Sequence, residues 1–275
     1  MTSPVERALE YVRRRCDAGS GEVNFPVTLN FHPDIAVAGG IAIELIARSG
    51  TYRSQFETGM SSGGLTAHRG GDRWHWESRI FGGAYDEDDP ALRPKYGALN
   101  HRLDPVGGSR RFGSCHFRLS PRVLPRTTFC YPDSHLEPHD FAVGDAAALI
   151  ALAEVNELGL DQLLDNYVEA HVHGPLRVGE DIEALVLDPS YRGTSVENAA
   201  NALGCPVEWH EGFHLDLNHA PDFELFRGAV AAEAIARIAE NGMVTPAILG
   251  CARDRALDYQ TAKWVWHCIA RFGHP

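Results

Sequence analysis

The first third of the chain alternates between helix-like and strand-like patterns of apolar residues. Residues 5–16 place apolar side chains at helical spacing and predict an amphipathic helix, followed by a glycine-containing break. Residues 27–34 (VTLNFHPD) read as a β-strand that ends at Pro33. Residues 35–50 predict a second helix, weakened by a Gly-Gly pair and closed by Gly50.

A long polar stretch separates this start from a group of strands. Residues 51–57 (TYRSQFE) predict a strand, whereas residues 58–99 are rich in glycine, polar and aromatic residues. Long irregular segments inside a compact domain are usually functional, so we expect a functional loop or lid there. Residues 111–121 and 126–132 are again strand-like.

The second half of the chain moves from mixed structure to helices. Residues 145–166 are helical in pattern, and residues 167–174 and 180–189 resemble two strands linked by a turn. After about residue 222 the apolar spacing is helical only.

These patterns predict an α+β protein without internal repeats. We expect residues 1–221 to form a catalytic-type domain that includes the N-terminal helix over residues 5–16. Residues 222–275 are predicted to form a helical C-terminal cap packed on that domain.

Composition narrows the class of protein. The 275 residues are 44% hydrophobic, enough for a substantial core, and contain no apolar run of the ~20 residues that a membrane helix requires. The charged N-terminus lacks the apolar core of a signal peptide, so a cytoplasmic location is expected, with delivery into another cell left open. The six cysteines are scattered, which is typical of reduced thiols. A net charge of -12 disfavours nucleic acid as a partner.

Candidate chemistry is concentrated in residues 166–176 (NYVEAHVHGPL). Glu169, His171 and His173 fall at alternate positions of a predicted strand, so their side chains should leave the same face. Three interpretations are open: a polar surface on an edge strand, a metal site, or a single catalytic carboxylate at Glu169.

The metal interpretation requires a third ligand besides the two histidines. Residues 210–219 offer one in His210, His214, Asp216 or His219, but no spacing to His171 and His173 is a familiar one. The letters HEGFH match HExxH only formally, because Gly and Phe are poor helix formers. We therefore expect no metal and keep a metal-dependent hydrolase built on these residues as the alternative.

A resemblance to a known family supports the interpretation of Glu169 as a catalytic carboxylate. The order of VTLNFHPD, a helix, the serine-rich FETGMSSGG and the late strand YVEAHVHG resembles the ADP-ribosyltransferase family. The segment RIFGGAYDEDDPALRPKYGAL is similar to the poly-ADP-ribose polymerase segment that contains two tyrosines. The resemblance covers roughly residues 23–190. The whole chain also resembles an uncharacterised bacterial domain family of unknown function, which implies no chemistry.

The transferase resemblance implies a fold of two packed mixed sheets and a substrate, NAD, whose ADP-ribose is transferred as nicotinamide leaves. The acceptor would be a protein or a small molecule, with a toxin or effector as one possible role and a non-catalytic binding module as a further alternative. Glu169 would be catalytic, stabilising the positive charge on the ribose. The residues expected to bind NAD are His32, Ser61, Ser62, Tyr85, Tyr96 and, at the diphosphate, Arg79.

Overall fold

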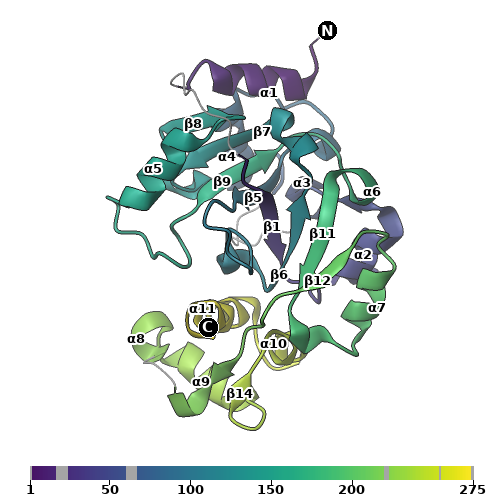
Figure 1. The fold of residues 1–275 in the computed structure, drawn as a ribbon, viewed down its shortest axis with the longest axis vertical. Helices are drawn as coiled ribbons and strands as arrows, with labels where there is room; N and C mark the ends of the chain where they lie inside the picture. The colour runs from purple at the N-terminus through teal and green to yellow at the C-terminus, as the bar shows by residue number, and fades with distance from the viewer. Residues whose placement is uncertain (1, 17–23, 60–66, 220–222, 254, 274–275) are drawn as a thin grey trace.

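A computed structural model describes residues 2–16, 24–59, 67–219, 223–253 and 255–273. It is an α+β fold in which helices surround one large mixed sheet (Figure 1). None of the helices in these ranges is both long and apolar enough to cross a membrane. Ser61 and Ser62 lie outside the described residues.

The large sheet has eight strands in the order β12-β11-β6-β1-β5-β9-β7-β8. Neighbouring strands are antiparallel except for β11 and β12, which are parallel. The strands are β1 (Val27–Phe31), β5 (Lys95–Leu99), β6 (Cys115–Leu119), β7 (Thr127–Tyr131), β8 (Asp140–Val143), β9 (Val168–Val172), β11 (Ile182–Leu187) and β12 (Val207–Trp209).

A single sheet replaces the two packed sheets that we expected. The reason is that β1 pairs along one edge with β5 and along the other with β6, which joins the two halves into one hydrogen-bonded array. The strands expected over residues 167–174 and 180–189 are present as β9 and β11. They are not neighbours in the sheet, where β5, β1 and β6 lie between them.

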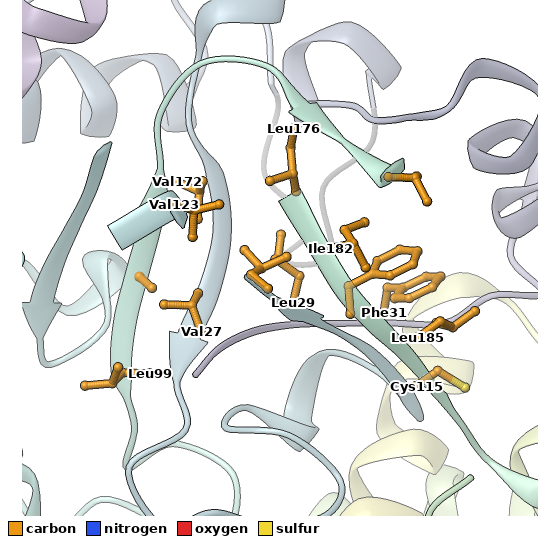
Figure 2. Packing of buried hydrophobic residues seen from close by; sticks show 14 of the residues in the cluster. Val27, Leu29, Phe31, Leu99, Cys115, Val123, Val172, Leu176, Ile182 and Leu185 are labelled. Carbon is orange, nitrogen blue, oxygen red and sulfur yellow. The ribbon is translucent and has the colours of Figure 1, made fainter. Parts of the chain in front are cut away.

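One face of the sheet carries the main hydrophobic core. Alternate residues of the central strands, such as Val27, Leu29 and Phe31, are buried there, and Figure 2 shows them beside apolar side chains of β6, β9 and β11. The helices that contribute side chains to this core include α2 (Ala42–Ser49), α5 (Ala147–Val155) and α7 (Ser195–Asn201).

The opposite face is covered by α1 (Pro4–Arg13) and α4 (Asp72–Phe81), which share a second apolar cluster with Cys130 and Phe141. The long segment over residues 58–99 is thus not irregular throughout, since it contains α4 and β5. Helix α4 forms because its buried residues recur at helical spacing, and it ends at Gly82, whose φ of 62° is left-handed.

Short elements complete this part of the chain. The first half of the helix expected over residues 35–50 is instead a two-stranded hairpin, β2 (Ala36–Val37) and β3 (Gly40–Ile41), because Gly39 and Gly40 adopt φ of 97° and 146°. The remaining short elements are β4 (Thr51–Tyr52) paired with β10 (Leu176–Arg177), α3 (Gln55–Thr58), α6 (Val178–Asp181), and the 3-10 helices η1 (Pro90–Leu92), η2 (Arg110–Phe112), η3 (Pro121–Arg126), η4 (Ser134–Leu136), η5 (Pro189–Tyr191) and η6 (Leu217–His219).

The C-terminal part gathers at one end of the sheet, in the lower half of Figure 1. Its helices enclose a separate apolar cluster, and Trp266 donates its indole N–H to the carbonyl of Arg111 at 2.9 Å. These elements are α8 (Phe223–Arg227), α9 (Ala229–Ile238), α10 (Pro246–Arg253), α11 (Tyr259–Phe272) and the pair β13 (Leu215–Asp216) and β14 (Met243–Val244).

Candidate functional site

Strand β9 lies inside the sheet, between β5 and β7, and two of its residues, together with the residue that follows it, place three ionisable side chains at alternate positions. Glu169, His171 and His173 are all buried, with 6%, 0% and 0% of their surface exposed. Val168, Ala170 and Val172 point the other way, into the main core. Because β9 lies inside the sheet and the three polar side chains are buried, they do not form a solvent-exposed surface on an edge strand.

Glu169 is held by groups from two other segments. Its Oε2 accepts a hydrogen bond from the backbone N–H of Ser134 at 2.7 Å and lies 3.3 Å from Nε2 of His171. The thiol of Cys130, which faces Glu169 across the β7–β9 pair, donates to the same oxygen at 3.5 Å. The carboxylate therefore has a fixed orientation within the sheet.

The two histidines are joined through one threonine. Oγ1 of Thr128 lies 3.0 Å from Nδ1 of His171 and 2.9 Å from Nε2 of His173. The other nitrogen of His173 is 2.6 Å from the hydroxyl of Tyr85, whose ring stacks on the imidazole. Both nitrogens of His173 are thus occupied, and its burial holds the pKa of this imidazole well below its usual range.

Two neighbouring carboxyl groups, Glu169 and Asp133, have pKa values that are shifted in opposite directions. Burial acts to raise the pKa of Glu169, but the hydrogen bond and charge of His171 and the Ser134 N–H outweigh it and lower that pKa. Burial and the charge of Glu169 together raise the pKa of Asp133. Glu169 is therefore the stronger acid of this pair, and Asp133 is the more basic carboxylate.

A second polar layer joins β5 to α4. The hydroxyl of Tyr96 donates to Glu77 at 3.1 Å, and the other oxygen of Glu77 accepts from Arg93 at 2.6 Å. The guanidinium of Arg73 lies 4.4 Å from the centre of the Tyr96 ring, and the imidazole of His171 packs edge-on against the same ring at 5.2 Å. Among the described residues, Nε and Nη1 of Arg73 are buried and have no hydrogen-bond partner.

The structure brings some of the predicted residues together and separates others. Tyr85 and Tyr96 contact the two histidines of β9. His32 does not lie beside Glu169: it follows β1 by one residue and packs edge-on against Trp266, with 4.6 Å between ring centres. Arg79 is on an exposed part of α4, where it pairs with Glu137 at 3.0 Å.

The register of the sheet explains the position of His32. Thr28 pairs with Ala98, and Ala98 pairs with Glu169, so these three residues form one row across β1, β5 and β9. His32 lies four residues beyond Thr28, which at about 3.3 Å per residue is roughly 13 Å along the strand. This displacement carries it towards the C-terminal helices.

His210 and His214 do not complete a site with His171 and His173. His210 is buried elsewhere, with Nε2 at 2.8 Å from the carbonyl of Ser114 and Nδ1 accepting from the N–H of Gly212 at 3.0 Å. His214 is exposed. Neither of these two histidines is therefore a third ligand at His171, and the side chain of His219 lies outside the described part of the chain.

Sequence reasoning missed Arg73, Cys130 and Ser134. Cys130 and Ser134 meet Glu169 only through the pairing of β7 with β9, which joins segments distant in the chain. Arg73 had a weak local signal, because it shares one helical stripe with Glu77 and Ile80, and all three are buried. Although no metal was expected, the described residues contain one group of potential ligands: Cys130, Glu169 and His171.

A family model matches residues 26–158 and 145–272, which together span most of the chain. The chain belongs to the DUF3626 family, described as a protein of unknown function. The two DUF3626 segments include the site, with Arg73, Tyr96 and Cys130 in the first, and Glu169 and His171 in the second. No curated protein matches the chain. Neither result supports a relationship to the ADP-ribosyltransferases, so the resemblance to that family remains a prediction.

Proposed function

We propose that this protein is an NAD-dependent ADP-ribosyltransferase, in which a variant of that fold with one large sheet is extended by the C-terminal helices. It would transfer ADP-ribose from NAD to a protein or small-molecule acceptor. The observation that carries the proposal is the state of Glu169: a buried carboxylate that is kept ionised and fixed by His171 and the Ser134 N–H. A preoriented anion is what a developing ribosyl cation requires.

The proposed step breaks the bond between ribose and nicotinamide, and the bonding electron pair leaves with nicotinamide. The Glu169 carboxylate accepts a hydrogen bond from the ribose and stabilises the oxocarbenium-like charge. The acceptor nucleophile then bonds to the ribose carbon and loses its proton. Asp133 interacts with Glu169 and has a raised pKa, which suits a group that takes up this proton.

Tyr96 is the better of the two tyrosines for stacking on nicotinamide. Tyr85 is only 1% exposed, and its ring already stacks on His173. Tyr96 is half-buried, and a cation, the guanidinium of Arg73, already lies over its ring at 4.4 Å. A pyridinium is also a planar cation, so the ring offers it the same attraction.

Arg73 takes the role at the diphosphate that we expected of Arg79. Its buried Nε and Nη1 lack partners in the described part of the chain, whereas Arg79 already has a carboxylate partner. When the nicotinamide ring takes the face of Tyr96, the displaced guanidinium is free to pair with phosphate oxygens.

The test is nicotinamide release and NAD binding measured for Glu169→Gln. Glutamine keeps the shape of the side chain and removes its charge, so turnover should fall by about 10²- to 10³-fold while NAD affinity changes far less. Glu180→Gln, at an exposed site on α6, is the control and should keep full activity.

Two outcomes contradict the proposal. Full turnover in Glu169→Gln removes this residue from the reaction. An unmodified protein that binds NAD without consuming it, or that does neither, favours the binding-module alternative or a different chemistry.

A further inference from the structure

Three potential metal ligands of different chemistry meet at one point of the sheet. Sγ of Cys130, Oε2 of Glu169 and Nε2 of His171 all lie within 4.8 Å of one another. The three separations are 3.5 Å from sulfur to oxygen, 3.9 Å from sulfur to nitrogen and 3.3 Å from nitrogen to oxygen. The residues come from adjacent strands, so backbone pairing fixes their spacing.

This triangle has the size of one face of a tetrahedral zinc site. Zinc bonds of about 2.3 Å to sulfur and about 2.0 to 2.2 Å to nitrogen and oxygen place neighbouring ligand atoms roughly 3.3 to 3.6 Å apart. Two of the three separations fall in this range, and the third exceeds it by a few tenths of an ångström.

Surrounding groups orient the ligands. The Thr128 hydroxyl has one hydrogen, so it can donate to His173 while it accepts from Nδ1 of His171, and a metal at Nε2 of His171 would take the place of the proton that this nitrogen shares with Glu169. Phe81 packs edge-on against the same imidazole at 5.3 Å, and the Ser134 N–H fixes Glu169. Metal-binding histidines are commonly oriented in this way through their second nitrogen.

We propose that Cys130, Glu169 and His171 form a three-ligand site for a divalent transition metal, with Zn²⁺ as the fitting ion. Sulfur and imidazole donors favour Zn²⁺ over Mg²⁺ or Ca²⁺, which prefer oxygen alone. Binding converts the Cys130 thiol to a thiolate and displaces the proton on Nε2 of His171, and the displaced protons pass to solvent. His173 is not a ligand, because Thr128 and Tyr85 occupy both of its nitrogens.

Zinc at this site has a consequence that rests on the proposed function. The ion would coordinate the carboxylate that stabilises the ribosyl cation, so Zn²⁺ binding and NAD turnover would exclude each other. The same three side chains then give a metal-inhibited form of the enzyme.

The experiment uses the full chain, freed of metal by a chelator, and titrates it with Zn²⁺ and with Co²⁺ as a spectroscopic substitute. We expect one Zn²⁺ per chain, and for Co²⁺ a thiolate charge-transfer band together with the intense visible bands of tetrahedral cobalt. Thr128→Val should weaken Zn²⁺ binding by about 10- to 100-fold, and Cys130→Ser or His171→Asn should weaken it further. Cys251→Ser, which alters an exposed cysteine outside the group, should have no effect.

A cobalt spectrum without a sulfur band overturns the metal site, and that result needs no variant to fold. Zinc binding that survives both Cys130→Ser and His171→Asn also overturns it. The inhibition is tested separately, by adding Zn²⁺ to the metal-free protein during NAD consumption. A protein that binds Zn²⁺ with the expected spectrum but never consumes NAD keeps the metal site and loses the transferase. A protein that consumes NAD and binds no metal keeps the transferase and loses the metal site.

Discussion

At the scale of single residues, Arg73 and Arg93 illustrate two ways of burying a positive charge. Arg93 is paired with Glu77 at 2.6 Å and also donates to the carbonyl of Tyr85. Arg73 is buried to a similar degree, yet two of its nitrogens lack a partner among the described residues. Unsatisfied buried donors cost free energy, so Arg73 weakens the fold in return for a group that can receive a ligand.

Replacing Arg73 by Met tests this interpretation. Met keeps a long apolar side chain at this buried position and removes the charge that lies over Tyr96, so NAD should bind about 10- to 100-fold more weakly, through the loss of charge-assisted hydrogen bonds. The free energy of unfolding should stay the same or rise, because no satisfied hydrogen bond is lost. Calorimetric titration with NAD and urea denaturation measure the two quantities.

Arg79→Met is the matched control, since Arg79 lies on the same helix but is exposed and paired with Glu137. It should leave both NAD affinity and stability close to their original values. Weaker folding in Arg73→Met with unchanged NAD affinity would mean that Arg73 is structural.

The same residues show how far a site can be predicted from sequence. The sequence predicted that Glu169, His171 and His173 share one face, because strand alternation alone places them there. It did not predict that Cys130 and Ser134 approach Glu169, because their approach depends on which strands pair. His32 was misplaced for a related reason: alternation gives the face of a side chain but not its position along the neighbouring strand.

At the scale of elements, β5 approaches β1 unusually closely. A Cβ at Gly97 would lie 2.4 Å from the backbone oxygen of Thr28 on β1. Glycine therefore allows the two strands to pair at the point where the row of Thr28, Ala98 and Glu169 crosses the sheet.

Gly97→Ala should consequently destabilise the protein. Because the clashing atom belongs to the backbone, the strands must separate, and we expect a cost of about 1 to 3 kcal/mol in the free energy of unfolding. Urea denaturation provides the measurement. Gly179→Ala, in α6, is the control: a Cβ there meets nothing within 4 Å, so its stability should be unchanged or slightly raised. Equal stability of the two variants would show that β1 moves freely.

Strand β5 also shows why some elements escape prediction. Its sequence, KYGAL, has a glycine at its centre and a charged residue at its start. Lys95 is nevertheless buried, because its ammonium donates to the carbonyls of Ala91, Arg93 and Gly174. No local propensity anticipates three carbonyl partners, whereas β1, β6 and β9 consist mostly of ordinary strand formers and were predicted.

At the scale of the whole molecule, several histidines are buried without charge. Burial lowers the pKa of His116 and of His267 to about 3. The unfolded chain protonates these side chains near pH 6.5, whereas the folded chain does so only near pH 3. Their contribution to stability is therefore complete above pH 6.5 and is lost progressively as the pH falls towards 3.

The protein should accordingly become less stable between pH 7 and pH 5. Each histidine that stays neutral in the folded state contributes a slope of at most about 1.4 kcal/mol per pH unit below pH 6.5. Urea denaturation at several pH values measures the slope, and His116→Gln should reduce it. His68→Gln, at an exposed site, should not. A stability that is constant from pH 7 to pH 5 would contradict the burial of neutral histidines.

The place of β9 in the sheet also sets a constraint on how the chain is made. The segments that form β5 and β7 emerge from the ribosome before β9, yet β9 lies between them in the finished sheet. Until residue 168 has emerged, β5 and β7 each have one edge without its strand partner. Open edges recruit other chains, and pairings between distant segments form slowly. A nascent chain stalled before β9 would thus be prone to aggregation, and the site would appear only after most of the polypeptide has been synthesised.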